Sequence, residues 1–181
     1  MKRLIAVCLL GVVACSSGPR LGDLPRYVLG TAPEGTVLSE QSGERTLEDL
    51  TEGDQEKAQR YREAGFKGAY QHIFQEPAGF GESEAGLLLI SGAALFDDAD
   101  AGVEAIRQTI VAEGDATQLR PLEFSPFSYV VKGTLDPGLP PGILMVWPHD
   151  QVVMYLAAVA FGEVTERTLR QIAAAIDEGA P

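Results

Sequence analysis

Hydrophobic positions along residues 33–181 recur with two different periods. An apolar residue at every third or fourth position predicts a helix, whereas alternation or a short unbroken apolar run predicts a strand. These patterns predict six strands and three helices in the order βαββαβββα. The expected strands span 36–41, 66–74, 87–96, 127–134, 143–147 and 152–161, and the expected helices span 46–64, 97–113 and 164–176.

The two longest expected strands, 87–96 and 152–161, are apolar on both faces. Such strands need cover on both sides of a sheet, so we expect helices to pack against each face. Strands that follow one another through short turns must pair antiparallel. The sequence therefore predicts a single α+β domain, in which a mostly antiparallel sheet lies between two helical layers (an α/β/α sandwich).

The first fifteen residues have the pattern of a targeting signal. Lys2 and Arg3 form a positive start, and a mostly apolar run follows from Leu4 to Cys15. That run is shorter than the roughly 20 residues that span a bilayer. Its end, Val12-Val13-Ala14-Cys15, resembles the lipobox of bacterial lipoproteins, in which a signal peptidase cuts before the cysteine. The resemblance implies that Cys15 receives a diacylglyceryl group and that the new amino terminus is often acylated.

An ordinary secretory signal, with Cys15 as a coincidence, is the alternative interpretation. On the lipoprotein interpretation, residues 1–14 are the signal peptide, residues 15–32 are the lipidated cysteine and a tether, and residues 33–181 are the domain. Two or more acyl chains give stable membrane attachment. We therefore expect the domain outside the cytoplasmic membrane, anchored to its outer face or to the outer membrane of a two-membrane host.

The charge balance narrows the classes of partner. The chain carries 26 Asp and Glu against 14 Lys and Arg, for a formal net charge of −12. This balance argues against nucleic acid, because phosphate binding needs a basic patch. The cysteines are Cys8 and Cys15, so we expect no disulfide and no thiolate metal ligand in the mature domain. The glycines follow no nucleotide-binding spacing, so no cofactor is expected.

Candidate metal and catalytic residues are few. A zinc site needs three or four ligands, and neither His72 nor His149 has another His or Cys nearby in the sequence. We interpret His72 as half-buried on an aromatic strand face and His149 as a solvated turn residue. Asp97, Asp98 and Asp100 alternate partly like a calcium loop, but we favour an acidic helix start that the helix dipole stabilises. No residue is therefore assigned to catalysis or to a metal.

The element order over residues 33–178, behind a lipobox, resembles that of the uncharacterised secreted and lipoprotein domains of the Mog1/PsbP-like type. These domains are α/β/α sandwiches and are mostly non-enzymatic. The resemblance implies that this chain is a binding or accessory module.

Two connectors rich in glycine and proline, 77–86 and 135–142, are the candidate recognition loops. Loops carry function more often than core strands do. Phe80 and Leu139 are apolar residues set in these loops, and we expect them to contact a partner. The alternative is that both loops are plain connectors and that Phe80 folds back onto the core.

Three functions stay open. We favour a lipid-anchored, extracytoplasmic, non-enzymatic binding or accessory module, for which a protein is one candidate partner and an apolar small molecule is the other. The second is a carrier of an apolar small molecule or lipid. It is prompted by Ala157, Ala158 and Ala160, which either let a helix pack closely or open a cavity. The third is an enzyme whose site assembles from distant residues, since catalytic triads are defined by geometry and not by sequence order.

Overall fold

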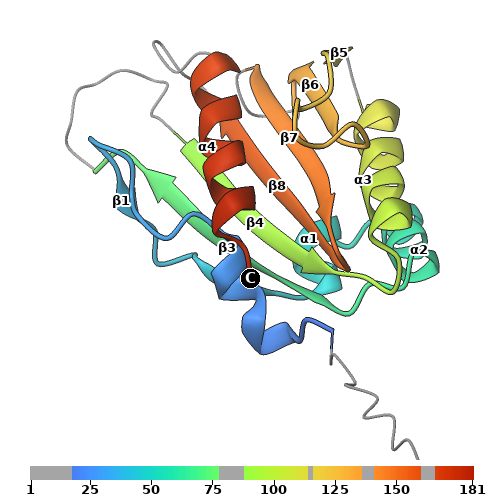
Figure 1. Cartoon of the computed structure of the whole chain (residues 1–181). Helices are drawn as coiled ribbons and strands as arrows, with labels where there is room; N and C mark the ends of the chain where they lie inside the picture. The colour runs from blue at the N-terminus through green and yellow to red at the C-terminus, as the bar shows by residue number, and fades with distance from the viewer. Residues whose placement is uncertain (1–17, 78–87, 114–115, 136–140, 160–165) are drawn as a thin grey trace, which may run out of the picture.

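The computed structural model describes residues 18–77, 88–113, 116–135, 141–159 and 166–181 (Figure 1). The strands are β1 (Val37–Leu38), β2 (Gly43–Arg45), β3 (Gly68–Gln75), β4 (Leu88–Leu95), β5 (Thr117–Gln118), β6 (Tyr129–Gly133), β7 (Gly142–His149) and β8 (Val152–Val159). They form one eight-stranded sheet in the order β1-β3-β4-β8-β7-β6-β5, with β2 also paired to β3. Neighbouring strands pair antiparallel, as predicted.

Helices cover both faces of the sheet. They are the 3-10 helix η1 (Leu21–Tyr27) and the α-helices α1 (Leu47–Thr51), α2 (Gln55–Glu63), α3 (Ala99–Glu113) and α4 (Glu166–Gly179). Helix α4 and η1 pack on one face, and α1, α2 and α3 pack on the other (Figure 1). The predicted α+β sandwich is therefore confirmed. None of the helices in the described part of the chain is long and apolar enough to cross a membrane.

Alternate residues of the central strands enter two separate cores. On one face, Met154 and Leu156 of β8 share a core with Leu169 of α4. On the other face, Val153 shares a core with Val103 of α3. Both apolar faces of the central strands are therefore buried beneath helices, as the sequence predicted.

The expected helix 46–64 is divided into two helices. Thr46 caps α1, because its hydroxyl accepts from Asp49 N at 3.2 Å and its own N–H donates to the Asp49 carboxylate at 2.7 Å. The chain then turns through Glu52 and Gly53, whose φ angles of 51° and 79° are left-handed. Asp54 starts α2 with a carboxylate oxygen that accepts two backbone N–H groups.

The folded domain begins at residue 21 and not at residue 33. Leu24, Tyr27 and Val28 are buried in the core beneath α4. The backbone N–H of Leu29 donates to the Ser91 hydroxyl at 2.9 Å, which fastens this segment to β4. The sequence placed residues 21–32 in the tether, but Leu24, Tyr27 and Val28 of this range belong to the core.

The Ser-Gly pair inside β4 does not interrupt the strand. Ser91 holds the segment after η1, and Gly92 lies opposite Tyr155 in the β4–β8 pairing. A Cβ atom at Gly92 would come within 1.9 Å of Tyr155 Cζ, so only glycine leaves room for this ring. The Tyr155 hydroxyl hydrogen-bonds the side-chain amide of Gln71 at 3.2 Å, and burial raises the pKa of the phenol.

The aromatic face expected on the strand 66–74 is confirmed except at its start. Tyr70, His72 and Phe74 follow one another on one face of β3, with ring centroids 5.3 and 5.9 Å apart. Phe66 precedes the strand and packs instead in the opposite core, 5.5 Å from the ring of Phe96. The chain is not yet extended at Phe66, so strand alternation does not apply there.

The expected strands 143–147 and 152–161 pair with each other as the β7–β8 hairpin, but its turn lies after His149, which the sequence assigned to the turn. Pro148 and His149 belong to β7 and pair with β8. The turn is made by Asp150 and Gln151, and Asp150 has a left-handed φ of 54°. This shift places the side chain of His149 on the sheet and not in the turn.

We predict that Gly92→Ala destabilises the domain by about 1–3 kcal/mol, because the added methyl group must displace the Tyr155 ring. Gly30→Ala is the matched control, since a Cβ there meets no atom within 4 Å. Chemical denaturation of both variants measures the difference. Equal stability of Gly92→Ala and the wild type would contradict this packing.

Candidate functional site

The residues that the sequence selected for function fall outside the described residues. Cys15 precedes residue 18, Phe80 lies within 78–87, and Leu139 lies within 136–140. Their roles therefore stay predictions. The candidate site described below is built from other residues.

His72 is half-buried, as predicted, and both of its ring nitrogens have partners. Its Nδ1 lies 2.8 Å from the backbone oxygen of Leu29, and its Nε2 lies 3.2 Å from the Tyr70 hydroxyl. This histidine therefore joins β3 to the segment that follows η1. Its role in the described structure is to hold these elements together.

The interpretation of His149 as a solvated turn residue is wrong. Its Nδ1 lies 2.9 Å from Asp177 Oδ1, and the same oxygen accepts from the buried Trp147 Nε1 at 3.1 Å. Because β7 extends through His149, the imidazole faces the last turns of α4. Asp177 thus fastens the C-terminal half of α4 to β7.

The acidic start of α3 has the structural role that we favoured. Asp98 Oδ1 accepts from the backbone N–H groups of Asp100 and Ala101 at 2.9 and 3.1 Å, so it caps the helix. Asp97 instead pairs with Lys67 at 2.8 Å. Across the described residues, no group of three or more His, Cys, Asp and Glu side chains is arranged to hold a metal ion.

The central residue of the candidate site is Arg170 of α4, whose side chain is only 7% exposed. Its Nε donates to Glu166 Oε1 at 2.7 Å, one turn earlier in the helix. Its Nη1 and Nη2 donate to the backbone oxygens of Pro121 and Arg120 at 2.9 and 2.6 Å. Glu123 Oε2 lies 3.7 Å from Nη1. A buried cation is tolerated when it is hydrogen-bonded and paired in this way.

The segment that Arg170 holds is itself internally bonded. The N–H of Leu122 donates to the Ser128 hydroxyl at 2.7 Å, and that hydroxyl donates to the Ser125 carbonyl at 2.6 Å. Nearby, the ring of Phe124 meets Trp147 edge-on, with centroids 6.1 Å apart and planes at 86°. The segment between β5 and β6 is therefore fixed against both α4 and β7.

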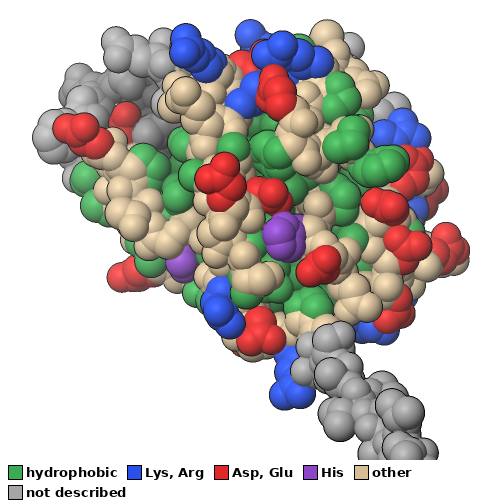
Figure 2. Space-filling model, viewed as in Figure 1, with side chains coloured by type: hydrophobic (Ala, Val, Ile, Leu, Met, Phe, Trp, Pro, Cys, Tyr) green, Lys and Arg blue, Asp and Glu red, His purple; other side chains and the backbone are tan. Residues whose placement is uncertain are grey.

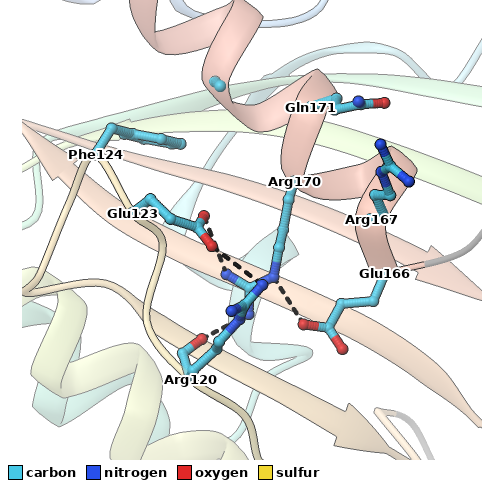
Figure 3. A pocket seen from close by; sticks show the side chains of 8 residues that line it. Arg120, Glu123, Phe124, Glu166, Arg167, Arg170 and Gln171 are labelled. Carbon is cyan, nitrogen blue, oxygen red and sulfur yellow. Dashed lines mark hydrogen bonds and ion pairs between the residues drawn. The ribbon is translucent and has the colours of Figure 1, made fainter.

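A hollow of about 790 Å³ lies between this segment and α4 and opens to solvent (Figure 3). It is lined by Arg120, Glu123, Phe124, Glu166, Arg167, Arg170, Gln171 and Ala174. Figure 3 shows Phe124 on one side, Arg167 and Gln171 along α4 on the other, and Arg170 between them. We call this feature the α4 hollow.

The α4 hollow is locally basic in an acidic protein. Three arginines and two glutamates line it, whereas the chain has a formal net charge of −12. Lys and Arg side chains gather at the end of the molecule where α4 begins, and acidic side chains are spread over much of the rest of the visible face (Figure 2). Such a local excess of positive charge attracts anions over short distances.

Sequence reasoning missed this site. The available signal was the i,i+4 pair of Glu166 and Arg170 at the edge of the apolar stripe of the expected helix 164–176. A pair at that edge can be read as an exposed ion pair or as a buried one, and periodicity does not distinguish the two. The carbonyl partners at residues 120 and 121 lie about fifty positions earlier in the chain.

Comparison with known proteins gives one structural likeness. No family model matches the chain, and no curated protein matches its sequence. A solved structure of the extracellular domain of PknH from Mycobacterium tuberculosis superposes with a TM-score of 0.49 and 16% sequence identity, over 87% of this chain and 94% of that chain. The function of this chain therefore has to be argued from its own residues.

We predict that Arg170→Met destabilises the domain by about 3–5 kcal/mol, because it leaves two backbone oxygens and the Glu166 carboxylate without their donor. Arg167→Met, three residues earlier on the same helix, is the control and should change stability by no more than about 0.5 kcal/mol. Denaturant unfolding of the two variants gives both values. Similar stabilities for the two variants would show that Arg170 does not anchor the segment.

Proposed function

We propose that the chain is a lipid-anchored binding or accessory module outside the cytoplasmic membrane, which presents the α4 hollow away from that membrane. The proposal is carried by the short distance between Cys15 and the first helix. Only residues 16–20 separate Cys15 from η1. Even fully extended, such a linker reaches about 18 Å at most.

One end of the domain therefore faces the lipid. Gly18 and Pro19 line a surface hollow together with Gln151 of the β7–β8 turn and the C-terminal Pro181. The start of the described chain, this turn and the C-terminus thus share one end of the molecule. An anchor on Cys15 holds that end against the membrane.

The α4 hollow lies at the other end of α4. This helix has 14 residues and ends near Pro181, whereas the hollow is lined by its first turns (Figure 1). At a rise of 1.5 Å per residue, α4 is about 20 Å long. The hollow therefore stands well clear of the lipid and is accessible to a molecule that arrives from the aqueous side.

A carrier of an apolar molecule is less well supported. Ala158 of β8 lies in the same core as Ala173 of α4. This arrangement favours the interpretation in which small residues let the helix pack closely. Ala157 points to the opposite face, and Ala160 lies outside the described residues.

An assembled active site is also less well supported. The His149–Asp177 pair has the geometry of a base and its orienting carboxylate, and the Trp147 indole also donates to that carboxylate. Within the described ranges, neither histidine hydrogen-bonds a serine or threonine hydroxyl. A nucleophile positioned by a base is the feature that hydrolytic catalysis requires.

Replacement of Cys15 by serine tests the anchor. We expect the wild type in the membrane fraction and the acyl-modified form by mass spectrometry, because two acyl chains hold a protein stably. The Cys15→Ser variant should lose the lipid. An unmodified Cys15 in a wild-type protein that remains folded would disprove the anchor.

The orientation of the domain is testable with single labels. The mature protein would have no free thiol, so Arg26→Cys and Arg167→Cys can each carry one fluorophore. Arg26 lines the hollow at the anchor end, and Arg167 lines the α4 hollow. In vesicles that contain headgroup-labelled quencher lipids, we expect strong quenching at position 26 and little at position 167. Equal quenching would contradict a fixed orientation.

A further inference from the structure

We propose that the α4 hollow binds a monocarboxylate with an apolar body, whose carboxylate pairs with Arg167 and whose body lies against Phe124. The inference deepens the proposed function, because it takes this hollow to be the recognition site of the module and names its ligand class. It rests on the hydrogen-bonding capacity that remains unused in the hollow, on the charge of the hollow, and on the position of the aromatic ring.

The polar side chains of the hollow without a described partner supply mainly donors. Arg167 has no ion pair and no hydrogen bond to any of the described residues, and its guanidinium carries five N–H donors. The side-chain amide of Gln171, one turn later on α4, is likewise without a described partner. Both side chains lie on the same side of the hollow (Figure 3). A ligand that complements them must bring acceptors, and a carboxylate accepts two parallel bonds from an arginine.

The carboxylates of the hollow are already engaged. Glu166 accepts from Arg170 at 2.7 Å. Glu123 lies 3.2 Å from Arg120 and 3.7 Å from Arg170. These two glutamates therefore neutralise two of the three arginines, and no acidic side chain among the described residues pairs with Arg167.

The same glutamates select against more highly charged anions. Glu123 is 64% exposed and Glu166 is 37% exposed at their side chains, so both face the solvent side of the hollow. Three arginines and two glutamates leave one net positive charge. One negative charge on the ligand balances this excess, whereas a phosphate dianion adds repulsion from two nearby carboxylates.

The apolar wall of the hollow is rigid. Phe124 is 37% exposed, and its ring is braced edge-on by the fully buried Trp147. Ala174 adds a small apolar surface on the α4 side. An aromatic ring or short alkyl chain packed on Phe124 would lose apolar surface to water, which favours binding.

Arg170 fixes the width of the hollow. Its bonds to the carbonyls of Arg120 and Pro121 tie the segment that carries Phe124 to the helix that carries Arg167. The elements that carry the two contacts of the ligand are therefore held at a fixed separation, although the Arg167 side chain itself is exposed. A fixed separation reduces the entropy lost on binding. A volume of about 790 Å³ is within the usual range of small-molecule sites.

The test uses the full chain, purified in detergent and labelled with ¹⁵N, and 3-phenylpropanoate as the probe. Side-chain signals of arginine Nε–Hε and glutamine amide groups report binding in NMR titrations. We expect saturable shifts of Arg167 and Gln171 at about millimolar probe, as is usual for a fragment in an open site. The neutral 3-phenylpropanamide and inorganic phosphate should each bind at least tenfold more weakly.

Matched variants localise the effect. Arg167→Gln should weaken 3-phenylpropanoate at least tenfold without loss of folding, and Arg167→Lys should restore part of the binding because it keeps the charge. Arg62→Gln removes an arginine from α2 on the opposite face of the sheet and should leave binding unchanged within twofold. Each variant is checked by its thermal unfolding.

Three results would overturn the proposal: no saturable shift at Arg167, equal binding of the amide or of phosphate, or equal weakening by Arg62→Gln. These outcomes are independent of membrane attachment. Loss of the Cys15 anchor together with retained carboxylate binding would refute the proposed location and keep the ligand class. An intact anchor without carboxylate binding would refute the ligand class alone.

Discussion

The central strands β4 and β8 determine the architecture, because both of their faces must be removed from water. Neither helical layer alone can do this, so α4 and η1 cover one face while α1, α2 and α3 cover the other. Positions within these strands are correspondingly constrained. The Ser91 hydroxyl accepts a hydrogen bond from Leu29 in the segment after η1. Position 92 must be glycine, because a Cβ atom there would overlap the Tyr155 ring.

The cover on the α4 face requires the burial of one cation. Arg170 lies beside the apolar stripe of α4, and the cost of removing its charge from water is offset only by carbonyl and carboxylate oxygens. The carbonyls belong to residues 120 and 121, so their hydrogen bonds to Arg170 hold the β5–β6 connection against α4. The same bonds that satisfy Arg170 leave the α4 hollow between helix and segment, with Arg167 at its rim. Arg170 therefore has a structural role, and the recognition role that we propose belongs to Arg167, three residues earlier on the same helix.

The parts of the fold that periodicity could predict are those with long buried faces. Strands β4 and β8 and helices α3 and α4 were expected almost at their observed positions, because burial repeats over many residues. The 3-10 helix η1 was missed, because Leu24, Tyr27 and Val28 follow no regular period. The candidate site was missed for another reason. Its key contacts join a guanidinium to backbone oxygens about fifty residues away. Every residue has a backbone carbonyl, so the sequence does not indicate which carbonyls will accept these bonds.

The overall charge and the local charge of this protein act over different distances. At about 0.15 M salt the Debye length is roughly 8 Å, so an anion inside the α4 hollow responds mainly to the arginines and glutamates that line it. At about 0.01 M salt the Debye length grows to roughly 30 Å, and the formal net charge of −12 then opposes the approach of any anion. Added salt should therefore first strengthen carboxylate binding and weaken it only when the contact with Arg167 is itself screened. The initial strengthening distinguishes this site from one in a uniformly basic protein, where salt weakens anion binding throughout.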